Sequence, residues 1–196
     1  PIVITALGSP ARVIETVHGY GGLVFADVGS VAMARKAAQA GVDGLILVST
    51  GAGGHTGSVS PFVFVQAVRQ FFDGIVVLAG GLCNGGAIRA AEVAGADLAD
   101  IGTLFIAARE SLAPDDYRQM VVDAGVDDLV LTKAFTGASA YYLRRSVERS
   151  GLDPDRRVIQ HIAAEYAPGD HHGHQDEAGP GGDQREQAEL GVDTCE

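Results

Sequence analysis

Three short segments of the chain combine glycines with residues that could take part in chemistry. The first runs from Gly51 to Gly57 and places His55 among four glycines. An imidazole has an unperturbed pKa of about 6.5, so this side chain could accept or release a proton near neutral pH. Glycines beside it would let the backbone turn sharply and approach a ligand closely, because no Cβ is in the way. We therefore expect His55 to have a catalytic or ligand-binding role.

The other two segments are Gly80–Gly81 and Gly102–Thr103. In (β/α)8 barrels a phosphate often binds at the loops after the last two strands, held by backbone N–H groups and a helix N-terminus. The hydroxyl of Thr103 would add a donor. Taken singly, each segment could be only a tight turn between a strand and a helix. Their occurrence on two consecutive units favours a phosphate site.

Each of these segments follows a short apolar run, at 44–48, 74–78 and 96–101. Continuous apolar runs of this length are typical of buried parallel strands. Two further strands are expected over 2–6 and 23–28, and helices are expected to begin near Pro10, Ser30, Ser60 and Asn84. Regular alternation of strands and helices predicts a parallel sheet with helical crossovers, whose ligands lie at the carboxyl ends of the strands.

The fold expected from this pattern is α/β, and specifically a (β/α)8 TIM barrel. Only about five strands are counted, and a complete barrel needs ~250 residues, so the chain should represent about the last five βα units, with earlier strands missing ahead of Pro1. After the fifth strand we expect helices over about 104–110, 114–124 and 138–149 and an extended piece over 129–131. The barrel part should cover residues 1–157.

Composition excludes several classes of function. The chain has 196 residues and a formal net charge of −11, so nothing indicates a basic nucleic-acid surface. No apolar run approaches the ~20 residues that span a bilayer, and two isolated cysteines, Cys83 and Cys195, fit a reducing cytoplasm. Residues 158–196 are acidic and rich in Gly and His, which predicts disorder. The histidines at 171, 172 and 174 offer no fixed geometry, so no metal site is expected.

Four motifs taken together resemble the nitronate monooxygenases, formerly called 2-nitropropane dioxygenases, which are FMN-dependent (β/α)8 enzymes. The motifs are Ala52–His55, Ala79–Gly81, Ile101–Thr103 with Phe105, and Ala134–Gly137, and the resemblance covers about residues 1–155. It implies that His55 is the catalytic base. It also implies a set of FMN-binding residues, namely Gly53, Gly54, Gly80, Gly81, Asp100, Ile101, Gly102 and Thr103.

The sequence departs from the family pattern at three positions of the site. Val48 stands where a glutamine commonly contacts the flavin, and Gly51 stands where a glutamic acid is common. Asp100 stands where a neutral residue is usual. A carboxylate beside a phosphate is repulsive unless it points away, so Gly102 and Thr103 are the stronger candidates for phosphate binding.

The resemblance implies that an alkyl nitronate or a neutral nitroalkane reacts with oxygen to give a carbonyl compound and nitrite. With a nitroalkane, His55 would remove the proton from the carbon that bears the nitro group. One alternative is a related flavin-dependent enoyl-thioester reductase, which shares the barrel and similar glycine loops. The other is a truncated barrel that does not hold FMN. Whether the protein forms a homo-oligomer is left open.

Overall fold

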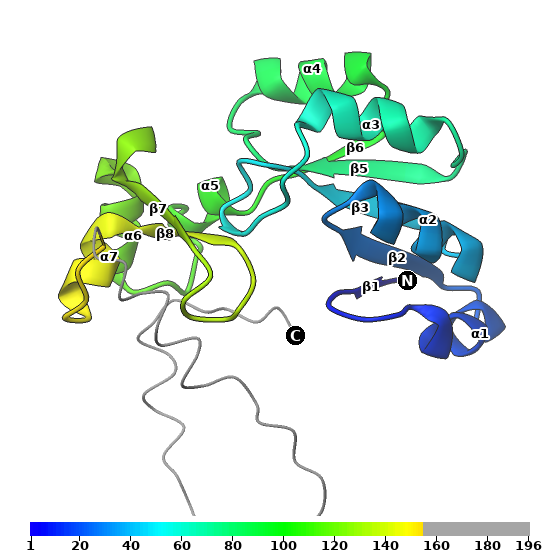
Figure 1. The fold of residues 1–196 in the computed structure, drawn as a ribbon, viewed down its shortest axis with the longest axis horizontal. Helices are drawn as coiled ribbons and strands as arrows, with labels where there is room; N and C mark the ends of the chain where they lie inside the picture. The colour runs from blue at the N-terminus through cyan, green and yellow to red at the C-terminus, as the bar shows by residue number, and fades with distance from the viewer. Residues whose placement is uncertain (155–196) are drawn as a thin grey trace, which may run out of the picture. The chain divides into compact units, whose positions relative to one another are not determined.

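A computed structural model describes residues 1–154. The chain divides into two compact units, residues 1–121 and residues 122 onward. The first contains a sheet of five parallel strands in the order β1-β2-β3-β5-β6, shown in Figure 1. The strands are β1 (Ile2–Thr5), β2 (Leu23–Val28), β3 (Gly44–Val48), β5 (Ile75–Ala79) and β6 (Leu98–Asp100). All five strands expected from the sequence are therefore confirmed.

Four helices connect these strands and begin where the sequence predicts. They are α1 (Ala11–Gly19), α2 (Val31–Ala40), α3 (Pro61–Arg69) and α4 (Gly85–Ala94). The Oγ of Ser30 accepts the Met33 N–H at 3.3 Å, and the Oδ1 of Asn84 accepts the Ala87 N–H at 2.9 Å. Both side chains thus satisfy a backbone donor that a helix N-terminus leaves unpaired.

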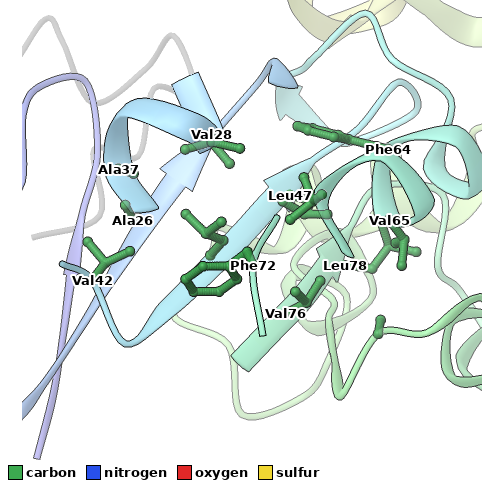
Figure 2. Packing of buried hydrophobic residues seen from close by; sticks show 14 of the residues in the cluster. Ala26, Val28, Ala37, Val42, Leu47, Phe64, Val65, Phe72, Val76 and Leu78 are labelled. Carbon is green, nitrogen blue, oxygen red and sulfur yellow. The ribbon is translucent and has the colours of Figure 1, made fainter. Parts of the chain in front are cut away.

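One face of the sheet packs against the helices and forms the main hydrophobic core (Figure 2). In β2 the even-numbered residues Val24, Ala26 and Val28 enter this core, because successive side chains of a strand point to opposite faces. Helix α3 contributes Phe64, which is fully buried. The helix-facing core therefore fixes the register in which the strands present their other face.

The opposite face of the sheet carries a second, smaller apolar cluster. It consists of Phe25, Ile46, Val77 and Ala79, with Ile75 packed against it. Asp27 follows Phe25 by two residues and so lies on this face. Asp100 pairs in register with Ala79 and lies there too. The residues of this face are those that would point into the interior of a barrel.

At the N-terminal edge of the sheet, two aspartates make the same set of contacts. Asp43 Oδ2 accepts the Val24 N–H at 2.7 Å and lies 2.8 Å from His18 Nε2. Asp97 Oδ2 accepts the Val76 N–H at 2.8 Å and pairs with Arg69. Each carboxylate thus ties the start of its neighbouring strand to the end of a helix. This edge lies away from the carboxyl ends of the strands, and in barrels it serves stability rather than catalysis.

Two helical predictions near the end of the described chain were wrong in extent. Instead of a helix over 104–110, the structure has the single turn α5 (Thr103–Ile106), which is followed by α6 (Asp115–Asp123). Instead of one helix over 138–149, it has β8 (Ala140–Leu143) and then α7 (Arg144–Arg149). β8 pairs antiparallel with β7 (Leu129–Thr132), which follows a 3-10 turn at Val126–Asp128. Pairing with β7 satisfies the backbone of 140–143 in place of helical hydrogen bonds.

The second unit has a small core of its own. Ala134 and Val147 are buried there, with Phe135, Tyr142 and Leu152 packed against them. The rings of Phe135 and Tyr142 lie 4.6 Å apart between centroids. The fourth motif of the sequence, Ala134–Gly137, therefore lies in the connection between β7 and β8.

Within residues 1–154 no helix is long and apolar enough to cross a membrane. Among the same residues, no group of three or more His, Cys, Asp or Glu side chains is arranged so that it could hold a metal ion. The predictions for residues 158–196 and for Cys195 lie outside the residues that the structure describes.

Candidate functional site

The loop after β3 is closed on itself by its own hydrogen bonds. The Thr50 N–H donates to the Val59 carbonyl at 2.9 Å, and the Thr56 hydroxyl donates to the Ser49 carbonyl at 3.1 Å. A Cβ at Gly57 would collide with the Val48 carbonyl, so only glycine fits this return of the chain. His55 is exposed and lies within this loop, in the two-residue strand β4 (Gly54–His55), which the sequence did not predict. The histidine is therefore presented by a closed loop, not by a free chain.

The loops after β3 and β5 are joined directly. The Gly81 N–H donates to the Gly51 carbonyl at 3.0 Å. Gly80 has φ +114°, and a Cβ there would lie 2.6 Å from Ser49 Oγ and 3.0 Å from the Ala52 nitrogen. The Ser49 side chain is fully buried and donates to the Ala79 carbonyl at 2.7 Å. Glycine at 80 thus allows the two loops to lie against each other.

The loop after β6 also reaches the histidine loop. A Cβ at Gly53 would collide with the hydroxyl oxygen of Thr103. Gly53 is two residues from His55, so the histidine loop contacts both of the other glycine segments. The structure therefore brings together the three segments that the sequence singled out, at the carboxyl ends of β3, β5 and β6. Their roles in binding or catalysis remain predictions.

The end of β2 also adjoins the histidine loop, a feature that sequence reasoning missed. A Cβ at Gly57 would lie 3.1 Å from the Gly29 carbonyl, just beyond β2. Two residues before Gly29 is Asp27, which faces the side of the sheet that the helices do not cover. No motif marks this aspartate. The signal that could have found it is a carboxylate inside an otherwise apolar strand, Leu23–Val28.

Asp27 is the most perturbed acidic group of the site. Burial, and secondarily the charge of Asp100, raise the pKa of Asp27 from 3.8 to about 6. Its Oδ1 is shielded from solvent, and no hydrogen-bond partner for that oxygen exists among residues 1–154. Perturbed carboxyl groups of this kind cluster at functional sites.

The predicted phosphate loops carry no cation of their own. No Lys or Arg occurs in segments 49–57, 80–84 or 100–103. Asp100 is exposed and Ile101 is half-buried, and Asp100 lies on the same face of the sheet as Asp27. A phosphate bound at these loops would therefore depend on backbone N–H groups and the Thr103 hydroxyl.

The backbone of the site suits a flavin mononucleotide. The positions that a Cβ would take at Gly54, Gly81 and Gly102 have no atom within 4 Å, so a ligand could approach the main chain there. This open backbone lies beside the tightly packed contacts at Gly53 and Gly80. Glycine backbone with open space beside it fits a phosphate ester, while the carboxylate of Asp100 is an unfavourable neighbour for its charge.

Comparison with known proteins gives consistent results. A sequence model of the nitronate monooxygenase family matches residues 1–186. The chain is 34% identical over 138 residues to a nitronate monooxygenase of Neurospora crassa, covering 66% of this chain and 36% of that protein. It is 30% identical over 150 residues to a hydroxy-methyl-oxo-octahydroindene carboxyl-CoA dehydrogenase of Rhodococcus jostii, covering 74% and 42%. The structure of a nitroalkane oxidase from Streptomyces ansochromogenes matches with a TM-score of 0.70 at 31% identity, covering 84% of this chain and 52% of that one.

These comparisons also bound what the chain represents. It spans about two fifths of the length of those curated relatives and about half of the solved structure. Its parallel βα sheet matches part of their TIM-barrel fold, which confirms the fold class. Which part of the barrel it forms, and the boundary expected at residue 157, remain predictions, and the family match continues beyond that residue.

Proposed function

The chain belongs to the nitronate monooxygenase family, and from that premise we propose that it takes part in the FMN-dependent oxidation of nitronates or nitroalkanes by oxygen. The products are a carbonyl compound and nitrite. The observation that carries this proposal is that the loop with His55 meets both later glycine loops, through Gly51 with Gly81 and through Gly53 with Thr103. A base and a phosphate cradle are thereby parts of one site.

His55 is the base in this proposal. With a neutral nitroalkane, the imidazole takes the proton from the carbon that bears the nitro group, and the resulting anion is the species that is oxidised. A nitronate arrives already deprotonated and does not need this step. FMN, when bound, supplies the redox chemistry with oxygen. The protein's part is to hold the carbon acid within hydrogen-bond reach of the imidazole.

The binding of FMN falls to the glycine loops and Thr103. The Gly102 N–H and the Thr103 hydroxyl offer donors to the phosphate. Gly81, whose N–H is bonded to the Gly51 carbonyl, leaves open space beside them, and Gly53 and Gly54 leave room for the flavin beside His55. Gly80 acts indirectly, because it keeps the loop after β5 against Ser49 and Ala52. In this proposal Asp100 lies beside the ligand but does not contact the phosphate, because its carboxylate would repel the phosphate charge.

A second candidate is a flavin-dependent oxidoreductase that acts on a thioester. The observation that favours it is the likeness to the Rhodococcus jostii dehydrogenase, whose name specifies a carboxyl-CoA substrate. The same glycine loops and histidine would serve such an enzyme. Turnover of an enoyl thioester with a reduced nicotinamide, without turnover of nitronates, would select this candidate.

The test begins with the purified chain and added FMN. After gel filtration the protein should retain the yellow cofactor; protein that stays colourless would contradict the proposal and favour a truncated barrel that does not hold FMN. His55→Asn should then keep FMN bound and lose turnover of a neutral nitroalkane by about 100-fold to 10,000-fold, the usual contribution of a general base. Turnover of the preformed nitronate should change much less.

A matched control is His18→Asn, at the opposite edge of the sheet. His18 lies on α1 and pairs with Asp43, so its loss should leave the ratio of nitroalkane to nitronate turnover unchanged. Unaltered turnover of the nitroalkane in His55→Asn would refute the assignment of the base. Equal loss with both substrates would show that His55 serves binding rather than proton removal.

A further inference from the structure

Asp27 is the one carboxyl group of the described chain that has a shielded oxygen without a partner. It lies among buried apolar side chains on the sheet face opposite the helices, where Phe25 precedes it by two residues and Ile46 pairs with it in register. A polar atom in such a place is costly unless something donates a hydrogen bond to it. The carboxylate of Asp27 therefore makes the ligand-free protein less stable than an apolar side chain at this position would.

Other carboxylates of the same sheet do not share this situation. Asp43 and Asp97, at the N-terminal edge, each accept a backbone N–H and pair with a basic side chain. Asp27 lies in the half of β2 that leads to the carboxyl edge. Asp43 and Asp97 thus stabilise the fold through their hydrogen bonds, whereas one oxygen of Asp27 has no hydrogen-bond donor among the described residues.

The position of Asp27 places this acceptor at the proposed flavin site. The loop after β2 touches the histidine loop through Gly29 and Gly57. In the strand order, β2 is next to β3, whose following loop carries His55. It lies on the side of β3 away from β5 and β6, whose following loops are the predicted phosphate loops. A flavin whose phosphate sits at β5 and β6 and whose ring reaches His55 therefore extends toward β2.

We propose that Asp27 accepts a hydrogen bond from the imide N–H of the bound flavin ring. This assignment rests on the proposed function, because it needs FMN in the site. The ring end of the ligand, not the phosphate end, is the part that approaches β2, and the imide N–H is a neutral donor there. The ribityl hydroxyls are donors of the same kind, and the ligands used in the test distinguish them from the ring.

The test measures flavin affinity rather than activity. Dissociation constants are obtained by quenching of flavin fluorescence for FMN, for lumiflavin, which lacks the ribityl chain, and for N3-methyl-lumiflavin, which lacks the imide N–H. Asp27→Leu should weaken binding of FMN and lumiflavin about tenfold to a hundredfold, the range expected for a hydrogen bond to a charged group. The wild type should bind N3-methyl-lumiflavin weakly, and Asp27→Leu should not weaken it further.

Two further variants serve as controls for the effect of Asp27→Leu. Asp73→Asn removes an acidic charge just before β5, at the opposite edge of the sheet, and should leave every affinity unchanged. Asp27→Asn keeps the shape and one acceptor oxygen, so it should weaken lumiflavin severalfold and decide the matter if Asp27→Leu does not fold. In the ligand-free protein, Asp27→Asn should unfold at the same urea concentration as the wild type or at a higher one.

The outcomes separate this inference from the function on which it rests. A wild type that binds no flavin overturns both. A wild type that binds FMN, with lumiflavin affinity unchanged by replacement of Asp27, overturns only the role of Asp27. If replacement of Asp27 weakens the binding of FMN but not that of lumiflavin, the donor to Asp27 is a ribityl hydroxyl, and the assignment to the flavin ring is overturned.

Discussion

Replacement of Gly80 by alanine tests the packing on which the candidate site depends, because two independent penalties act at this residue. Its φ of +114° is a conformation that residues with a side chain rarely adopt, which costs about 1–3 kcal/mol. The new Cβ would also lie 2.6 Å from Ser49 Oγ. Ser49 cannot turn away freely, because it is buried and bonded to Ala79, and overpacking of this kind costs about 1–3 kcal/mol. The expected loss of unfolding free energy is about 2–6 kcal/mol.

Alanine substitutions at two other glycines of the site distinguish the cost of the positive φ from the cost of the steric overlap. Gly81 has φ +69° but no atom within 4 Å of the added Cβ, so alanine there should cost only the backbone term of about 1–2 kcal/mol. Gly102 has neither a positive φ nor a close neighbour, so alanine there should change stability by less than about 0.5 kcal/mol. The loss of unfolding free energy should therefore be largest for Gly80→Ala, smaller for Gly81→Ala and smallest for Gly102→Ala.

The assay is urea unfolding followed by circular dichroism, with midpoints compared at equal slope. Addition of Ser49→Ala to the Gly80→Ala variant removes the atom that the new Cβ meets, so the double variant should lose less than the sum of the two single losses. A Gly80→Ala midpoint equal to that of Gly102→Ala would refute the reasoning. So would strict additivity with Ser49→Ala, because the steric term would then be absent.

Two further predictions concern stability away from the site. Burial alone would raise the pKa of Asp43, but hydrogen bonds from the Val24 N–H and from His18 outweigh it and hold this pKa below 3.8. Asp43 therefore contributes stability that is present above about pH 4 and is lost as the pH falls through its lowered pKa. Asp43→Asn should be less stable at neutral pH and should show a shallower acid transition in unfolding measured from about pH 5 to 2; parallel curves would contradict this. Phe64→Ala should cost about 3–5 kcal/mol, because Phe64 is fully buried, whereas Phe62→Ala on the same helix should cost little, because Phe62 is 56% exposed. Equal urea midpoints for these two variants would show that the helix-facing core is wrongly described.

The first part of the fold could be predicted closely because its signals are local. The apolar runs at 23–28 and 44–48 coincide with β2 and β3 residue for residue. Ser30 and Asn84 cap their helices as expected, since a cap needs only a side-chain oxygen and an N–H three residues on. Alternation of such elements left a parallel sheet as the natural arrangement.

The region after Gly102 could not be predicted as well, because distant contacts decide it. The run Ala140–Leu143 is apolar and aromatic and is compatible with a helix or a strand, and pairing with β7 selects the strand. The helix expected from 104 to 110 is reduced to the single turn α5. Local propensity is a weak guide in such segments, since tertiary contacts override it.

By itself, the sequence determined that an imidazole lies among glycines and that two further glycine turns follow strands, and from this it predicted which segments carry chemistry. Only the tertiary structure decided that these turns touch, through Gly51 with Gly81 and Gly53 with Thr103. It alone also showed that Asp27 lies on the sheet face opposite the helices, with a buried oxygen that has no hydrogen-bond partner among the described residues. The physical reason is that chain chemistry and turn propensity are local, whereas contact between loops and the burial of a charge depend on how separate strands are laid side by side.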